Sequence, residues 1–502
     1  MKYYGRLSTE FSFAVFRKHH KLQRLEMASR SRLASITFYG GVGEIGGNKI
    51  LLEDGDTRIF IDFGMSFARK EIFYGDFLGP RPANGLGDFL EMGLIPDLKG
   101  LYRDDLLATV RRKPEPPEFD AVILSHAHLD HSSYISFLHE KIPVYCGETC
   151  LLILQALQEG GSRSLESELI DFRKRPITDR KAPPVQREFR TFRTGQKLRI
   201  GSLEIEPVHV DHSIPGNYGF IIHTTEGAVV YTSDVRMHGT RPEMTKDFVE
   251  RAKESEPISL VSEGTRINLG KTGESEGKVL GTCNELVENS DKLVIADFSF
   301  KDVDRLRTFF SIAKKTERKL AVTLGDAFLL KYLTKDPKLQ IPPPDDDNIV
   351  VIVPKRGSGQ YRKEDYGTEE RQFLGQPNAW TADQLAKAQA KLIAHISYYN
   401  IGELIDIKPE KGSAFIHSLS EPFNEEMLGD FQRLHNWLKH FGLIFIQSHA
   451  SGHATGDELR QIIDEINAPS LFPIHTEHPE LFKAMAKQTE MTIAGKSYNL
   501  IA

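Results

Sequence analysis

Short apolar runs of strand length dominate the chain from residue 33 onward. Residues 34–39, 48–52, 58–63 and 121–124 each form such a run, and turn residues separate the first three. Runs of about four to eight apolar or alternating positions bounded by Gly and charged residues are typical of β-strands. Strand-like and helical segments then alternate to about residue 261, which predicts an α/β architecture.

A second region of alternating elements covers residues 263–440. Helical patterns occupy residues 302–315 and 382–395, whereas residues 293–296 and 320–323 have the apolar character of buried strands. This alternation predicts a second α/β unit. A strand-like run then returns at residues 443–449.

Two segments fit neither unit. Residues 1–32 carry several Lys and Arg residues without periodicity, and we interpret them as an N-terminal extension. Residues 64–118 are rich in Gly, Pro and aromatic residues and are interpreted as an insertion. No apolar run approaches the roughly 18 residues that span a bilayer, and the N-terminus lacks the apolar core of a secretory signal, so we expect no membrane association.

Composition narrows the class of protein. The 502 residues correspond to about three folding units at roughly 150 residues each. Hydrophobic residues make up 40% and charged residues 27%, which excludes a long disordered or fibrous chain. With 64 Lys and Arg against 70 Asp and Glu, the net charge of −6 excludes a uniformly basic surface. Three Cys residues indicate a reducing compartment, and we expect a cytoplasmic protein.

The glycine-rich segment 40–47 allows two interpretations. A dinucleotide-binding loop would follow a strand and open a helix, but here another strand-like run follows. We therefore favour a tight hairpin that borders a site.

The strongest chemical signal follows the strand at residues 121–124. His126, His128, Asp130 and His131 stand within six residues, and imidazole and carboxylate groups suit Zn²⁺ or Mn²⁺. On a loop these four side chains can converge, with enough donors for two metals. Further candidates end later strand-like runs, namely His212, Asp234 and His475. An Asp in such a place is often only a helix cap, so the whole set carries the prediction.

These residues resemble the metallo-β-lactamase superfamily, together with Asp62 at the end of a strand. Residues 262–265 and 449–453 are similar to motifs A and B of the β-CASP nucleases, and His475 lies in a motif C. The residues of these motifs are most similar to those of the ribonuclease J group. The resemblance implies an αββα sandwich built from residues 33–262 and 441–502, with an α/β β-CASP domain inserted at residues 263–440.

The resemblance also implies roles for particular residues. One metal would be held by His126, His128 and His212 and the other by Asp130, His131 and His475, with Asp234 between them. Asp62 would orient the metal-binding loop. Asp130, Glu263 and His453 would take part in catalysis, and His449 and Ser451 would bind substrate. Two divalent ions, Zn²⁺ or Mn²⁺, would be the cofactors.

The implied function is hydrolysis of RNA, from the 5′ end and also internally, in RNA processing or decay. The expected substrate is single-stranded RNA with a 5′-monophosphate, and oligomeric state stays open. The candidate backbone and stacking contacts to RNA are Lys355, Arg356, Arg362 and Lys363, beside Tyr361 and Tyr366. Three alternatives remain: a DNA nuclease of the Artemis type, a non-catalytic RNA-binding β-CASP paralogue, and a small-molecule hydrolase. The chain departs from the ribonuclease J pattern at residues 418–422 and at Thr476, where Gly is usual.

Overall fold

The computed structural model describes residues 33–501, apart from residues 76, 162–163, 178–180 and 421–424. The predicted extension at residues 1–32 lies outside this part of the chain. None of the helices within the described ranges combines the length and the apolar character that a membrane crossing requires.

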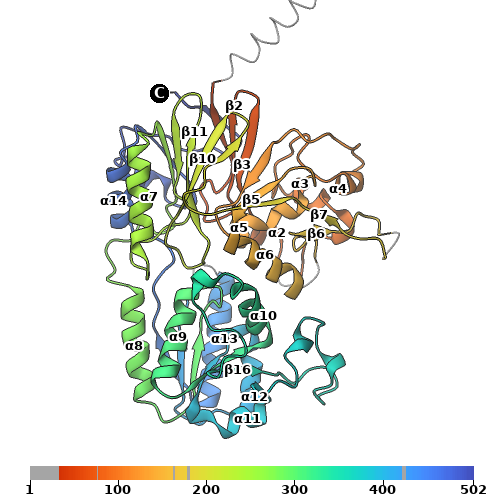
Figure 1. Cartoon of the computed structure of the whole chain (residues 1–502), viewed down its shortest axis with the longest axis vertical. Coiled ribbons are helices and arrows are strands. Elements are labelled where there is room, and N and C mark those ends of the chain that lie inside the picture. The colour runs from red at the N-terminus through yellow and green to blue at the C-terminus, as the bar shows by residue number, and fades with distance from the viewer. Residues whose placement is uncertain (1–32, 76, 162–163, 178–180, 421–424, 502) are drawn as a thin grey trace, which may run out of the picture.

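Two seven-stranded sheets face each other in the upper half of the molecule (Figure 1). The first has the order β23-β1-β2-β3-β4-β5-β8, with bounds Ser497–Asn499, Ser35–Gly40, Lys49–Asp54, Thr57–Phe63, Ala121–Ile123, Val144–Gly147 and Phe189–Phe192. The second has the order β22-β21-β13-β12-β11-β10-β9, with bounds Gln488–Thr489, Ser470–Pro473, Ser259–Ser262, Ala228–Tyr231, Tyr218–His223, Leu203–His209 and Leu198–Ile200. The segment at residues 40–47 therefore connects the antiparallel strands β1 and β2, as a hairpin requires.

Strand periodicity explains how the two sheets bury their faces. On β3, Ile59 and Ile61 join the core cluster between the sheets, and Phe60 joins the cluster on the outer face. Neighbouring residues of a strand point to opposite faces, so one strand serves both cores. Phe220 and Val229 contribute to the inner cluster from the second sheet.

Helices cover both outer faces and complete an αββα sandwich. The first sheet is covered by α6 (Glu148–Gly160) and by the segment interpreted as an insertion, which supplies α2 (Phe67–Phe73), η1 (Pro82–Asn84), α3 (Gly87–Glu91) and α4 (Asp104–Thr109). The second sheet is covered by α7 (Pro242–Glu254) and α14 (Gly456–Ile466). The remaining elements of this unit are α5 (Leu129–Ser132), η2 (Ser133–Phe137), β6 (Asp171–Phe172), β7 (Val185–Gln186) and η8 (Pro479–Phe482).

A parallel sheet forms the lower unit (Figure 1). Its order is β17-β16-β15-β18-β14-β19-β20, with bounds Ala379–Trp380, Ile349–Ile352, Lys319–Thr323, Leu392–His395, Val294–Asp297, Ala414–His417 and Ile444–Gln447. One face packs against α8 (Glu276–Glu288), α9 (Val303–Lys315) and α10 (Leu324–Leu333), and the other against α11 (Ala382–Lys387), α12 (Leu404–Ile407) and α13 (Glu425–Phe441). Short 3₁₀ turns η3 to η7 (Pro337–Leu339, Lys363–Asp365, Glu370–Gln372, Gln389–Lys391 and Tyr398–Glu403) link these elements. Burial on both faces explains the continuous apolar strands of this region.

Two expectations from the sequence differ from the structure. The predicted return to the first domain at residue 441 is too early, because β20 pairs with β19 in the third sheet. An apolar run identifies a buried strand but not the sheet that it joins. The helix predicted over residues 382–395 ends at Lys387, and its last four residues form β18. Burial in the parallel sheet outweighs the helical preference of the preceding Ala-rich segment.

Candidate metal centre

The candidate ligands follow the ends of strands along one edge of the sandwich. His126 and His128 follow β4, His212 follows β10, Asp234 follows β12 and His475 follows β21. Strands β12, β13 and β21 are parallel neighbours, so their carboxyl ends meet at this edge. Asp130 and His131 lie in α5, which directly follows His126 and His128 in the sequence.

Backbone strain accompanies this convergence. Asp62, Ser233 and His475 have φ values of 58°, 56° and 55°, in the left-handed region. Such conformations cost of order 1–3 kcal/mol each and persist where the surroundings impose them. Here they turn the chain sharply at the ends of three strands, so that the ligand side chains face one another.

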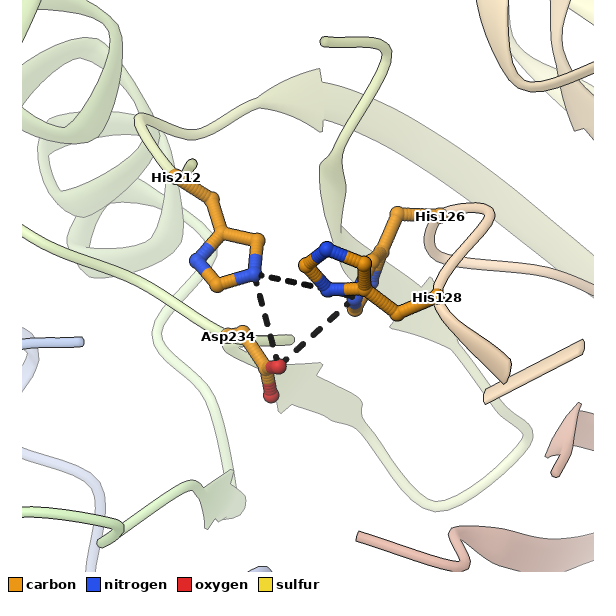
Figure 2. Close-up of side chains that lie close together, drawn as sticks. All are labelled: His126, His128, His212 and Asp234. Atoms are coloured by element: carbon orange, nitrogen blue, oxygen red, sulfur yellow. Dashed lines mark hydrogen bonds and ion pairs between the residues drawn. The ribbon is translucent and has the colours of Figure 1, made fainter. Parts of the chain in front are cut away.

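His126, His128, His212 and Asp234 form the first cluster (Figure 2). The Nδ1 atom of His128 lies 3.0 Å from His126 Nε2 and 3.2 Å from His212 Nε2. The Oδ2 atom of Asp234 lies 3.6 Å from each of those Nε2 atoms. Burial lowers the pKa of His126 and His212 well below the usual value and that of His128 to about 3. The three imidazoles are therefore neutral and offer lone pairs, as metal ligands must.

Asp130, His131 and His475 form the second cluster, with Asp234 beside it. His475 Nε2 lies 3.2 Å from Asp130 Oδ2, and His131 Nε2 lies 3.2 Å from Asp234 Oδ2. Two fully buried atoms here, His131 Nε2 and Asp234 Oδ1, make ion-pair contacts but no hydrogen bond of good geometry among the described residues. Leaving a buried polar atom unpaired costs about 1–3 kcal/mol, so these atoms fit ligands of a cation.

The other ring nitrogen of each histidine is already engaged in four of the five cases. His212 Nδ1 donates to the carbonyl oxygen of Gly452 at 2.6 Å, and His475 Nδ1 lies 2.8 Å from Thr265 Oγ1. His126 Nδ1 lies 3.0 Å from Ser125 Oγ, and His131 Nδ1 donates to Asp62. These contacts direct the Nε2 lone pairs into the clusters, which is how metal-binding histidines are usually oriented.

Asp62 lies beneath the metal-binding loop and is completely buried. Its carboxylate accepts hydrogen bonds from the Ser125 amide and hydroxyl, at 2.7 and 2.8 Å, and from Tyr231 Oη, at 2.9 Å. The fourth donor is His131 Nδ1, at 2.8 Å. This is the position that an orienting carboxylate would take.

Glu263 and His453 form a pair beside the second cluster. The Glu263 carboxylate accepts from the Val235 and Thr265 amides, at 2.9 and 3.0 Å, and lies 3.1 Å from His453 Nδ1. Burial acts to lower the pKa of His453, but the Glu263 carboxylate outweighs it and raises this pKa to about 9. The His453 ring lies 5.6 Å from that of His475 and 5.0 Å from that of His212.

His449 and Ser451 are placed differently from the metal-ligand candidates. The Nδ1 atom of His449 lies 3.1 Å from the Ser418 carbonyl oxygen, at the junction with the third sheet. The Ser451 hydroxyl accepts from the His453 amide, so it stabilises its own loop. The predicted stacking role of Tyr366 is wrong, because its ring is 2% exposed and its hydroxyl donates to Pro354.

The sequence pattern did not identify several residues of the site. Thr265 contacts His475, Ser125 contacts His126, and Tyr231 contacts Asp62. Hydroxyl-bearing residues in a strand or loop carry no distinctive spacing, so the sequence contained no signal for them. Lys301, between β14 and α9, is a charged residue near the site that the sequence pattern also did not identify. Burial lowers the pKa of its ammonium while the Asp130 carboxylate counteracts this, and its charge in turn lowers the pKa of His128. A lysine from the third-sheet unit therefore lies close to the metal centre.

Comparisons with known families match two parts of the chain. Residues 95–254 match the beta-lactamase superfamily domain, and residues 446–493 match the Zn-dependent metallo-hydrolase RNA specificity domain. The second match includes the loop with His449, Ser451 and His453.

Known relatives extend the similarity over most of the chain. A ribonuclease J of Pyrococcus abyssi is 25% identical over 453 residues, which cover 87% of this chain and 88% of that protein. A ribonuclease J of Helicobacter pylori is 25% identical over 311 residues, 61% of this chain but only 37% of that protein. The match thus spans less than half the length of this bacterial relative. The fold is shared with a protein of unknown function from Enterococcus faecalis V583, with a TM-score of 0.71, 23% identity, and coverage of 93% of this chain and all of that one.

Proposed function

This chain is a ribonuclease J-like protein of the metallo-β-lactamase superfamily, and from that premise we propose that it is a metal-dependent ribonuclease. The observation that carries the proposal is the convergence of the two ligand clusters beside the Glu263–His453 pair. Metal ligands support hydrolysis, and a positioned acid beside them supports cleavage of a phosphodiester bond.

The donor set fits two divalent cations, and we propose Zn²⁺ or Mn²⁺. His126, His128 and His212 would hold one, Asp130, His131 and His475 the other, and Asp234 would lie between them. Bound there, the ions would activate a water as nucleophile and neutralise charge on the phosphoryl oxygens. Asp62 would keep the His131 ring in the required orientation through its Nδ1 hydrogen bond.

His453 is proposed as the proton donor to the leaving oxygen. Its Nδ1 proton is held by Glu263, so Nε2 is the atom that can reach substrate. The Glu263 carboxylate, 3.1 Å from Nδ1, raises the pKa of His453 and so favours the protonated ring. A positioned acid of this kind contributes about 10²–10⁴-fold to a rate.

The proposed substrate is single-stranded RNA with a 5′-monophosphate, degraded from the 5′ end and also cut internally. The match of residues 446–493 to an RNA specificity domain and the names of the relatives support RNA over DNA. Within that segment, His449 and Ser451 are the proposed contacts to a substrate phosphate.

The test uses one RNA sequence with a 5′-monophosphate, a 5′-triphosphate or a 5′-hydroxyl, and a DNA of the same sequence. We expect mononucleotide release from the monophosphorylated RNA, loss of activity on chelation, and recovery with Zn²⁺ or Mn²⁺. Asp130→Ala should abolish cleavage. Asp120→Ala, at the opposite end of β4 where the carboxylate accepts from the Arg58 amide, is the matched control and should stay active. Cleavage of DNA in preference to RNA, or cleavage by metal-free protein, would refute the proposal.

A further inference from the structure

Two completely buried arginines lie where the sandwich meets the third-sheet unit. Arg236 follows Asp234 in the sandwich, and Arg305 lies in the first turn of α9 in the other unit. Both guanidinium groups contact the same carboxylate oxygen, Oε1 of Glu276 in α8, at 3.0 Å. We call these three side chains the arginine clamp.

Further carboxylates neutralise the clamp. Arg236 pairs with Asp211 at 3.1 Å and with Asp304 at 2.8 Å. Asp302 is a further acidic neighbour of Arg305, because its carboxylate caps α9 and accepts from the Arg305 amide at 3.1 Å. The ion pairs cross between units, because Asp211 belongs to the sandwich whereas Asp304 and Glu276 belong to helices of the third-sheet unit.

Both arginines also donate to the backbone of one loop, residues 448–453. Arg236 Nη1 lies 3.3 Å from the carbonyl oxygen of Ser451, and Arg305 Nη2 lies 3.3 Å from that of Ala450. Arg305 Nη1 additionally contacts the carbonyl oxygen of Ser418 at 2.8 Å. The loop therefore receives charged donors from both units on two successive carbonyl groups.

The same loop reaches the metal centre on its other side. The Gly452 carbonyl accepts from His212 Nδ1 at 2.6 Å, and the Ala454 amide donates to Val235 at 2.6 Å. His453 stands between these two anchors and projects its ring to Glu263. Displacement of a catalytic group by about 1 Å can reduce a rate by about 10²-fold, so the anchoring of this loop bears directly on the reaction.

We infer that Arg236 and Arg305 are positioning residues that, through Glu276, fix the 448–453 loop and thereby His453 against the metal centre. The inference rests on the proposed function for its kinetic consequence but not for its structural one. The third-sheet unit would then contribute to catalysis, because Glu276 of α8 and Arg305 of α9 hold the loop that carries the proposed proton donor His453.

The experiment compares Arg305→Lys, Arg236→Lys and Glu276→Gln with Arg318→Lys in the full-length protein. Arg318 is the matched control, since it is also buried and donates to the carbonyl oxygens of Lys292 and Leu392, but within the third-sheet unit. Four properties are measured: kcat and KM on 5′-monophosphorylated RNA, Zn²⁺ affinity, thermal unfolding, and hydrogen exchange of the amides of residues 448–456.

We expect each clamp variant to lower kcat at least tenfold, with Zn²⁺ affinity within about twofold of that of the unsubstituted protein. KM should rise as well, because the same loop carries His449, which Arg305 contacts at 3.4 Å, and Ser451. Hydrogen exchange of the loop amides should be faster in the clamp variants than in Arg318→Lys. This difference should remain even if the unfolding midpoints of the clamp variants and of the control fall equally. Normal kcat and normal loop exchange in the clamp variants, or the same kcat loss in Arg318→Lys, would overturn the inference. An unsubstituted protein that cleaves no RNA would instead refute the proposed function, and the exchange measurement would still decide the structural claim.

Discussion

Replacement of Asp62 by Asn probes the metal centre without touching a proposed ligand. The carboxylate accepts from four donors, with Oδ1 serving the Ser125 amide and Oδ2 serving the Ser125 hydroxyl, Tyr231 and His131. An Asn amide has one acceptor oxygen, and its nitrogen can only donate. Whichever way the amide turns, at least one buried donor faces the NH₂ group.

The size of the effect follows from these contacts. One buried donor without a partner costs about 1–3 kcal/mol of stability. Loss of the partner that orients a metal-binding histidine typically reduces metal affinity about 10–100-fold, which corresponds to about 1.4–2.8 kcal/mol. We therefore expect Asp62→Asn to lower Zn²⁺ affinity by one to two orders of magnitude, through a misoriented His131.

The assay is a competition titration of Zn²⁺ between the protein and a chromophoric chelator near neutral pH. Asp54→Asn is the control, because Asp54 is an equally buried carboxylate that accepts from the Thr225 amide and hydroxyl at the far end of β2. It should lose stability but retain Zn²⁺ affinity. If Asp62→Asn binds Zn²⁺ as tightly as Asp54→Asn does, the proposed orientation of His131 by Asp62 is wrong.

Three further changes have distinct expected outcomes. His453→Gln should lower kcat about 10²–10⁴-fold in single-turnover RNA cleavage while the metal content stays unchanged, and an unaltered rate would exclude it as the acid. We propose that the Lys301 ammonium, which interacts electrostatically with Asp130 of the metal centre, contacts a substrate phosphate. Lys301→Ala should then raise KM about tenfold, whereas Lys314→Ala on the exposed side of α9 should leave KM unchanged. Burial lowers the pKa of Lys49 to about 7. Because the unfolded chain keeps this proton up to a pH near 10.5, stability should rise between pH of about 7 and 10. Lys49→Met should remove that rise and raise the unfolding midpoint at pH 7, as urea or thermal unfolding across this range would reveal.

The sequence predicted the strands that carry the site because their apolar runs are short and bounded by turn residues. Predicted strands at residues 58–63 and 121–124 became β3 and β4 with shifts of one residue. The cluster from His126 to His131 was detectable because four ligand-type side chains stand within six residues of a strand end. His475 lies far away in the sequence, and only the resemblance to a family placed it beside Asp130, which it contacts at 3.2 Å.

Other features of the site depend on tertiary contacts that have no local signature. Arg305 has the appearance of an ordinary helical arginine, yet it is completely buried and shares Glu276 with Arg236. Lys301 approaches Asp130 only because α9 docks beside the sandwich, where Val303 packs in the same cluster as Ala127. Strand β20 could not be assigned to a sheet from its apolar residues alone. A short apolar run does not determine which strand it pairs with, because the packing of the whole chain decides that pairing.

The charge balance, −6 over the chain, is consistent with a phosphate-binding site once the buried cations are considered. Arg103, Arg236 and Arg305 are completely buried and paired with carboxylates, so they do not contribute to a basic surface. Positive charge for binding RNA could instead come from groups beside the metal centre, namely the bound cations, His453 and Lys301. The pocket next to His212 adds Arg193, Arg241, Arg307 and Lys338. Each phosphate that a protein neutralises adds to the salt dependence of nucleic-acid binding. The salt dependence of KM would therefore report how many substrate phosphates these groups neutralise.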